Sequence, residues 1–214
     1  MSEPSRRTIG RPRRSSAETL ADAAAELFLE NGWSHTTVDQ IAQRAGVSRG
    51  TFFNHFESKS DLFWLDLDEG LAGLAGLLRE GGGRGGSPVR VVEAALVEVG
   101  RAHDPGRVPW ALTQSEAMGL GDELVASAAV RVMRLQAVVA THLAEASGGS
   151  RGGLAAEVAA SALVAAAATA ITWWARSGVG RRGLDDVLAE AIRPVADGLE
   201  SVAGHAVRSD PIVD

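Results

Sequence analysis

The sequence predicts an all-α protein, on three observations. Alanine is abundant, tyrosine is absent and aromatic residues make up 5% of the chain, a composition that favours helices over strands. Helix-capping signals recur along the chain, and apolar residues follow each of them at helical spacing. No segment shows the strict alternation of a strand, and the sequence has no internal repeat. With 214 residues, 45% of them hydrophobic, the chain can form a small N-terminal head and a larger helical body.

Four helices are expected in the first 80 residues, because each begins at a capping residue. Residues 16–31 follow the capping box Ser-Ser-Ala-Glu and end at Asn-Gly. Residues 37–44 begin at a second box, Thr-Val-Asp-Gln, and residues 48–55 begin at a serine. The fourth helix, 58–80, begins at Ser-Lys-Ser-Asp and carries leucines along one face. Three helices of a head should therefore lead into one long helix.

Five more helices are expected in the rest of the chain. The glycine-rich run 81–86 should end the fourth helix, and Ser87-Pro88 should open the next one as its N-cap and first residue. A loop with two prolines follows at 103–109. The remaining helices are expected over 109–119, 122–146, 154–176 and 184–204, the last kinked at Pro194, and 205–214 should form a frayed tail.

Composition excludes several classes of function. The chain has no cysteine, which excludes thiolate metal sites and disulfides and fits a reducing, cytoplasmic compartment. Its five histidines are scattered, and it has neither a serine elbow nor a phosphate-binding loop, so we expect no enzyme, no cofactor and no metal. Residues 158–175 carry no charge, but most are Ala, Ser or Thr, so we expect a packed helix there and no membrane span.

Residues 37–56 predict a helix-turn-helix. Two tightly crossing helices need a small residue on the first and a glycine four positions later in the turn, and Ala42 and Gly46 meet both needs. Ile41, Val47 and Phe52 are spaced to seal the crossing. An ordinary pair of antiparallel helices would show the same spacing, so the exposed residues have to decide between the two interpretations.

The second helix of this motif has a polar side with no acid before Glu57. The chain carries a net charge of -6, so a merely solvated side would ordinarily include acids. An acid-free polar side suits a surface that meets phosphates and base edges. Lys59 follows at a helix start, where amide groups also favour an anion. Residues 1–14 contain five arginines against one glutamate, and they form either a DNA-contacting arm or a solvated, disordered tail.

These motifs resemble the tetracycline-repressor-like (TetR) family of regulators. The resemblance runs from about residue 14 to residue 68 and rests on AxELFxExG (24–32), TTVxxIAxxAGVSRGTFF (36–53) and HFxSKxDL (55–62). The C-terminal part is similar only in its helical layout. The resemblance implies a basic arm at 1–14, a three-helix DNA-binding head at 15–61, and a multi-helix body at 62–204 for effector binding and dimerisation.

The resemblance also implies a role for individual residues on double-stranded, palindromic operator DNA. The DNA-binding set is Arg11, Arg13, Arg14, Thr36, Thr37, Ser48, Arg49, Thr51, Phe53, Asn54, His55 and Lys59. Arg49 and Thr51 would act in the major groove, while His55 and Lys59 would hold the DNA backbone. The family usually has tyrosine where Phe53 stands. Either one phosphate contact is lost, which we favour, or Phe53 contacts a thymine methyl.

A homodimer and an effector cavity follow from the same resemblance. The dimer would form through 154–176 and 184–204, with Ala159, Ala162, Ala166, Ala170, Leu188 and Ile192 at the interface. A small, mostly apolar effector would contact Arg101, His103, Trp110, Met118, Arg134, Leu135 and Trp174, although Trp and Met at helical spacing are more often core residues.

A narrower resemblance concerns Thr51-Phe52-Phe53, Asp61-Leu62, Trp64, Asp66, Asp68 and Val108-Pro109-Trp110. These residues are similar to those of regulators found with mycofactocin biosynthesis, which implies a long-chain acyl thioester as a candidate effector. The main expectation is therefore a ligand-responsive repressor. The alternative is a helical ligand-binding or scaffold module whose helix-turn-helix is incidental.

Overall fold

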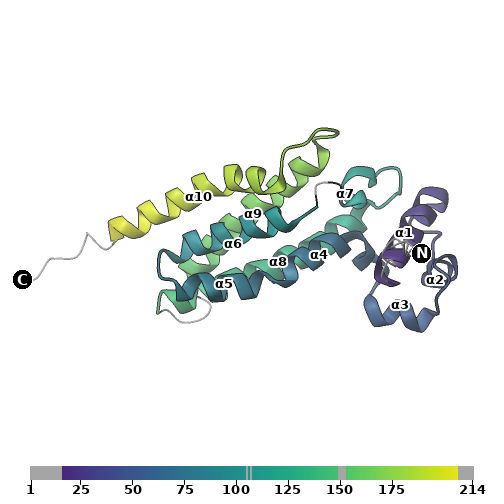
Figure 1. The fold of residues 1–214 in the computed structure, drawn as a ribbon, viewed down its shortest axis with the longest axis horizontal. Coiled ribbons are helices and arrows are strands. Elements are labelled where there is room, and N and C mark those ends of the chain that lie inside the picture. The colour runs from purple at the N-terminus through teal and green to yellow at the C-terminus, as the bar shows by residue number, and fades with distance from the viewer. Residues whose placement is uncertain (1–15, 105, 107, 149–152, 207–214) are drawn as a thin grey trace, which may run out of the picture.

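Every regular element in the residues that the structure describes is a helix, which confirms the all-α class. The computed structural model describes residues 16–104, 106, 108–148 and 153–206. Figure 1 shows a small head of three helices at one end of the molecule, from which the longer helices of the body extend. The predicted division into a helix-turn-helix head and a helical body is therefore correct.

The head consists of α1 (Ser16–Asn31), α2 (Val38–Arg44) and α3 (Arg49–His55). The capping box that was predicted for α2 is present: the Thr37 backbone N–H donates to Gln40 Oε1 at 2.8 Å, and the Gln40 backbone N–H donates to Thr37 Oγ1 at 3.2 Å. Ser48 caps α3, since its hydroxyl accepts from the Thr51 backbone N–H at 3.0 Å. The box predicted for α1 begins outside the described residues.

A compact aromatic core holds the head together. Phe28, Ile41 and Phe52 are fully buried in it, and Phe63 joins them from the segment after α3. Ala42 lies buried at the crossing of α2 and α3, where its carbonyl accepts from the Val47 N–H at 2.9 Å. The turn between these helices needs a residue with positive φ, and Gly46 supplies it at +69°.

The long helix that was predicted over 58–80 is wrong, because three shorter elements occupy this region. They are the 3-10 helix η1 (Lys59–Trp64), α4 (Leu65–Ala72) and α5 (Leu74–Gly83). Gly73 separates α4 from α5. The predicted break at 81–86 also begins later than expected. A Cβ on Gly81 would lie 2.6 Å from Val91 Cγ1, so this glycine allows α5 to pack closely on the next helix.

The body is completed by α6 (Pro88–Ala102), α7 (Trp110–Gln114), α8 (Gly121–Ala146), α9 (Leu154–Arg176) and α10 (Leu184–Ala206). These positions agree with the sequence except at a few ends. The helix predicted over 109–119 is shorter, and the last helix continues two residues past its predicted end at 204, with Pro194 inside it. The tail from 207 onward lies outside the described residues.

Two helices, α8 and α9, are long and apolar enough to cross a membrane by length and composition alone. α9 nevertheless lies among α7, α8 and α10, and its Leu163, Val164 and Trp174 are buried in the core of the body. Its small residues let the neighbouring helices approach closely. This is the placement of a core helix, as the sequence predicts for residues 158–175.

Candidate nucleic-acid interface and ligand cavity

The outer side of α3 is polar and open to solvent. Ser48, Arg49, Asn54 and His55 are exposed, and Thr51 is partly exposed. The opposite side of the helix places Phe52 in the core of the head. Because the head core fixes α3 in this orientation, its polar side chains are directed away from the protein. The structure thus brings together the α3 residues that were predicted to meet DNA.

Arg49 has two neighbours on this surface. One guanidinium nitrogen lies 2.8 Å from a carboxylate oxygen of Asp39, and the guanidinium carbon lies 5.0 Å from the centre of the Phe53 ring. The expectation of an acid-free surface was therefore incomplete, because it considered α3 alone and Asp39 comes from α2. Phe53 is 46% exposed, and its ring makes a cation–π contact with the Arg49 guanidinium.

Two predicted DNA contacts, Thr36 and Lys59, are engaged inside the head. Thr36 is 2% exposed, and its hydroxyl donates to the carbonyls of Gly32 at 2.9 Å and Leu27 at 3.2 Å. The Lys59 ammonium donates to the carbonyls of Trp33 and Thr36, both at 2.7 Å. The ammonium also lies 3.7 Å from the centre of the Trp33 ring, and burial lowers the pKa of Lys59.

These contacts correct the roles that the sequence suggested for both residues. Buried polar groups need internal partners, and backbone carbonyls of the last turn of α1 and of the loop after it provide them here. Lys59 therefore fastens η1 to the loop between α1 and α2, and the side chain of Thr36 does not reach the surface. Thr37 is exposed at the N-terminus of α2. Arg11, Arg13 and Arg14 lie outside the described residues.

A cavity of about 150 Å³ lies in the body, lined mainly by residues of α4, α6, α8, α9 and α10. Its wall is mainly apolar and includes Leu67, Leu71, Leu96, Val99, Leu112, Val132, Leu135, Val164, Ile171, Leu184 and Leu188. The polar residues of the wall are Asp66, Asp68, His103, Arg131 and Thr172. A cavity with an apolar wall and a few polar groups suits an apolar ligand with one polar end. Among the described residues, no group of three or more His, Asp or Glu side chains is placed to hold a metal ion.

Only two of the predicted effector contacts, His103 and Leu135, line this cavity. Trp110 and Met118 pack with the aromatic core of the head and not with the cavity. Trp174 is fully buried beside the cavity, where its indole N–H donates to the Arg182 carbonyl at 2.9 Å. These three large residues are core residues, which is the alternative that their helical spacing had left open.

The two predicted arginine contacts also lie elsewhere. Arg101 is exposed and pairs with Glu98 and with Asp185. Arg134 is exposed on α8, and the cavity wall instead contains Arg131, one turn earlier on the same helix. The sequence did contain a signal for Arg131, since it precedes the inward-facing Leu135 by four residues and therefore shares its side of α8.

The predicted dimer residues are mostly turned inward. Ala170, Leu188 and Ile192 are buried within one protomer, while Ala159 and Ala166 pack partly against its core. Ala162 is partly buried. The exposed side of α9 instead carries large apolar residues: Leu154, Val158 (55% exposed) and Trp173 (58% exposed). Most of the residues predicted for a dimer interface therefore pack inside the chain, and the large apolar residues of α9 that face solvent are different ones.

Two families match the chain, one for each part of the fold. Residues 20–64 match the family described as bacterial regulatory proteins, tetR family, and residues 86–200 match the MftR C-terminal domain. The second match spans more than half of the chain. The boundary between the two matches falls in the segment formed by α4 and α5.

The curated relatives are regulators. The mycofactocin biosynthesis transcriptional regulator MftR of Mycobacterium tuberculosis is 39% identical over 75 residues, which are 35% of this chain and 38% of that protein. The transcriptional repressor AcnR of Corynebacterium glutamicum is 32% identical over 97 residues, which are 44% of this chain and 45% of that protein. The chain therefore aligns with less than half of the length of either relative.

The solved structures have the same fold. FadR of Thermus thermophilus, a TetR-family transcriptional repressor in complex with lauroyl-CoA, matches with a TM-score of 0.53 at 28% identity over 85% of this chain and 94% of that one. NalD of Pseudomonas aeruginosa, a secondary repressor of a multidrug efflux pump, matches in fold with a TM-score of 0.51 at 24% identity over 86% and 95%. With its helix-turn-helix head and the two family matches, the chain belongs to the tetR family of bacterial regulatory proteins and has a body of the MftR type.

Proposed function

We propose that the protein is a cytoplasmic, ligand-responsive transcription repressor that binds a palindromic operator as a homodimer and is released by a small, mostly apolar effector. The observation that carries the proposal is the outward polar side of α3, which the buried Phe52 holds in place. The mainly apolar cavity in the body adds a place for a signal molecule. The fold and the relatives favour a binding protein over an enzyme.

On DNA, α3 would enter the major groove. Arg49 and Thr51 would act on base edges, while Ser48, Asn54, His55 and the exposed N-terminus of α2 at Thr37 would meet sugar and phosphate groups. Phe53 has no hydroxyl for a phosphate. Its ring instead lies against Arg49, so we infer that Phe53 holds the Arg49 guanidinium in place. The basic arm would add contacts outside the major groove.

Dimerisation would place two copies of α3 on successive turns of the operator. This requires a separation of about one helical turn, roughly 34 Å. We assign the interface to the exposed apolar side of α9, with Val158 and Trp173, together with the outer side of α10. A face of this kind is stabilised when a second copy removes it from water.

The effector would occupy the apolar cavity and favour a state in which the two heads no longer fit the operator. A preference of about 1.4 kcal/mol for that state gives a tenfold loss of operator affinity. We infer an effector with an apolar chain, for which an acyl thioester is the leading candidate. The apolar wall and the lauroyl-CoA bound to the FadR relative support this choice.

The test is binding of the purified protein to genomic DNA fragments, followed by fluorescence anisotropy on a selected fragment. We expect steep salt dependence and a clear preference over scrambled DNA. Arg49→Ala should cost about 1–3 kcal/mol of binding to the specific site. Arg134→Ala, which removes an exposed arginine far from α3, is the matched control and should bind as the unchanged protein does.

The same experiment distinguishes the alternatives. A scaffold or ligand-binding module would bind no fragment in preference to scrambled DNA, and Arg49→Ala would then have no specific effect. Addition of lauroyl-CoA tests the effector class, because it should reduce operator binding. Operator binding should in turn weaken the binding of lauroyl-CoA by the same factor. Equal lauroyl-CoA affinity with and without DNA would contradict the proposed release.

A further inference from the structure

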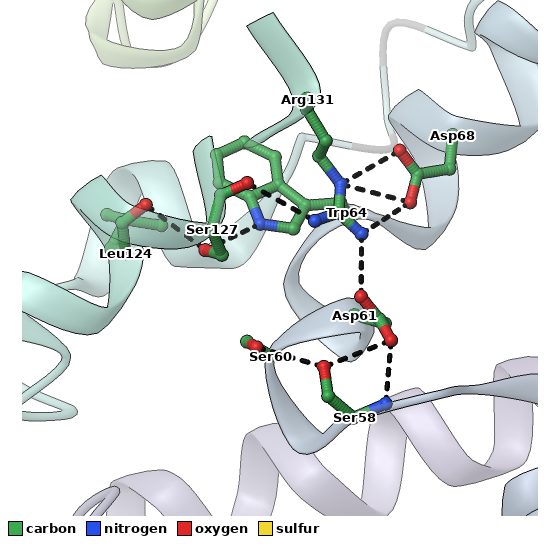
Figure 2. A network of polar contacts seen from close by, with 8 residues as sticks. All are labelled: Ser58, Ser60, Asp61, Trp64, Asp68, Leu124, Ser127 and Arg131. Carbon is green, nitrogen blue, oxygen red and sulfur yellow. Dashed lines mark hydrogen bonds and ion pairs between the residues drawn. The ribbon is translucent and has the colours of Figure 1, made fainter. Parts of the chain in front are cut away.

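Arg131 on α8 connects the ligand cavity to the segment that follows the DNA-binding helices. Figure 2 shows its guanidinium between two carboxylates, Asp61 of η1 and Asp68 of α4. Arg131 belongs to the body, whereas Asp61 lies within the stretch that matches the DNA-binding family. One side chain thus bonds both parts of the protein.

On the side of the head, the contact is to a residue that shapes the start of η1. Arg131 Nη2 donates to Asp61 Oδ1 at 3.0 Å. The other oxygen of the same carboxylate accepts from the Ser58 backbone N–H at 2.7 Å and from the Ser58 hydroxyl at 3.0 Å. Asp61 therefore holds the chain where it leaves α3, and Arg131 holds Asp61.

On the side of the cavity, two nitrogens of the Arg131 guanidinium bond to the carboxylate of Asp68. Arg131 Nε lies 2.9 Å and 3.1 Å from the two oxygens of Asp68, and Nη2 lies 2.7 Å from Oδ2. Both side chains are part of the cavity wall, together with Trp64, whose ring centre lies 5.5 Å from the guanidinium carbon. The Trp64 indole N–H donates to the Ser127 hydroxyl at 3.0 Å, which ties the ring to α8 (Figure 2).

The positive charge and the burial of Arg131 would make its junction with Asp61 and Asp68 sensitive to a ligand in the cavity. The Arg131 side chain is 16% exposed, so its bonds to the two carboxylates are partly shielded from water. Among the described residues of the cavity wall, Arg131 is the one with a permanent positive charge. A carbonyl or carboxylate oxygen at the polar end of an apolar ligand would accept from this guanidinium and would compete with Asp68 and Asp61 for its donors.

We propose that Arg131 couples the ligand cavity to the DNA-binding head. Its bond to Asp61 holds the head in the arrangement that binds operator. A ligand that hydrogen-bonds to the Arg131 guanidinium breaks this bond and lets the head leave that arrangement. The inference rests on the proposed function, because it specifies how the cavity and α3 would communicate. It also predicts the polar feature of the ligand, a hydrogen-bond acceptor at one end of an apolar chain.

The first test compares operator affinity in variants of the junction. We expect Arg131→Gln to bind a selected operator fragment about tenfold more weakly, a size typical of coupling between sites. Asp68→Asn, which changes the cavity side alone, should weaken binding in the same direction, and Arg131→Lys should lie between Arg131→Gln and the unchanged protein. Arg134→Gln, an exposed arginine one turn away on α8, is the control and should have no effect.

A double-mutant cycle with Asp61→Asn and Asp68→Asn then separates coupling from simple loss of stability. If both carboxylates act through Arg131, the combined loss of operator affinity will be smaller than the product of the two single losses. Independent effects that multiply would overturn the proposal. The proposal would also be overturned if Arg131→Gln binds operator as tightly as the protein without substitutions, or more tightly. This holds whether or not the variant has a lower melting temperature.

The second test needs neither DNA nor ligand. Hydrogen exchange of the free protein should be faster over residues 58–64 in both Arg131→Gln and Asp68→Asn, and unchanged in Arg134→Gln. Faster exchange confined to α8 would overturn the connection to the head. If the unchanged protein binds no DNA fragment selectively, the proposed function fails, whereas this measurement still decides whether Arg131 links the two parts.

Discussion

At the scale of single residues, the sequence identified the exposed side of α3 but not the partners of its side chains. The types and spacing of Ser48, Arg49 and Asn54 were sufficient to predict a polar surface. The pairing of Arg49 with Asp39 was not predictable from the spacing within α3, because it depends on how α2 crosses that helix. Lys59 illustrates the same limit, since its carbonyl partners at Trp33 and Thr36 precede it by more than twenty residues.

The contact between Arg49 and Asp39 leads to a prediction about specificity. Asp39→Asn should leave the free energy of unfolding within about 0.5 kcal/mol of its original value, because an exposed ion pair contributes little to stability. If α3 binds DNA as proposed, the variant should bind scrambled DNA more tightly, since it removes a negative charge next to Arg49. Its preference for the specific site should fall, because Arg49 loses the group that orients it.

Anisotropy with specific and scrambled fragments at two salt concentrations measures this effect. Asp22→Asn on α1 serves as a control for the change in net charge. An unchanged ratio of specific to scrambled affinity in Asp39→Asn would show that the pair has no role in orienting Arg49.

The pKa of Asp61 gives a prediction about pH. Burial alone would raise it, but hydrogen bonds from Arg131 and Ser58 outweigh burial and hold it below its ordinary value of 3.8. The ionised carboxylate therefore stabilises the folded state at neutral pH, and this contribution is lost as the pH falls through the lowered folded-state pKa. We expect Asp61→Asn to be less stable than the unchanged protein at pH 6, and we expect the difference to shrink towards pH 3.5. Urea unfolding at a series of pH values tests this, and a difference that stays constant over this range would contradict it.

At the scale of elements, capping residues predicted helix starts better than apolar spacing predicted helix length or orientation. The starts of α2, α3 and α6, each predicted from a capping residue, were correct to within one residue. The single helix predicted over 58–80 was wrong, because residues 59–64 form a 3-10 helix and a further break falls at Gly73, and leucine spacing reports neither. The inward placement of the α9 alanines was not predicted, because a helix made mostly of small apolar residues has no clear polar side.

Glycines within helices give a prediction about packing between elements. A Cβ on Gly100 of α6 would lie 2.6 Å from Leu188 Cδ1 and 3.0 Å from the Asp185 backbone nitrogen, whereas one on Gly76 of α5 would meet nothing within 4 Å. Gly100→Ala should therefore destabilise the protein by about 1–2 kcal/mol through overpacking of α6 against α10. Gly76→Ala should stabilise it by up to about 1 kcal/mol, because alanine favours the helix.

Chemical denaturation of both variants tests the contrast, since the change in side chain is identical. Equal effects of the two substitutions would contradict the close contact between α6 and α10. A gain in stability for Gly100→Ala would mean that Leu188 and the Asp185 backbone move aside at little cost.

At the scale of the whole molecule, the exposed apolar side of α9 gives a prediction about assembly. Val158 is exposed in the single chain. Under the proposed dimer contact, Val158→Glu should shift the protein from dimer to monomer, because it would place a charge where the contact excludes water. The monomer should bind a palindromic operator far more weakly, since it loses the second head. Val125→Glu, a change at an exposed valine of α8, is the matched control and should remain dimeric.

Light scattering during size-exclusion chromatography measures this outcome. If the Val158→Glu variant remains dimeric, the dimer contact lies elsewhere. If the protein without any substitution is monomeric, the homodimer itself is contradicted. The family resemblance led to the prediction that α9 takes part in a dimer, which stays a prediction. The sequence could not predict which side of α9 is free for such a contact, because burial in α9 depends on where α8 and α10 lie.

The position of Lys59 has a practical consequence. It is the one lysine in the sequence, and its amine lies between the Trp33 ring and two carbonyls. An acylating reagent for primary amines can therefore modify only this side chain and the α-amino group of the chain. The rate of Lys59 acylation, followed by peptide mass spectrometry, reports how often η1 separates from the head, without an introduced label. Small molecules that loosen this segment can be found by screening for faster acylation.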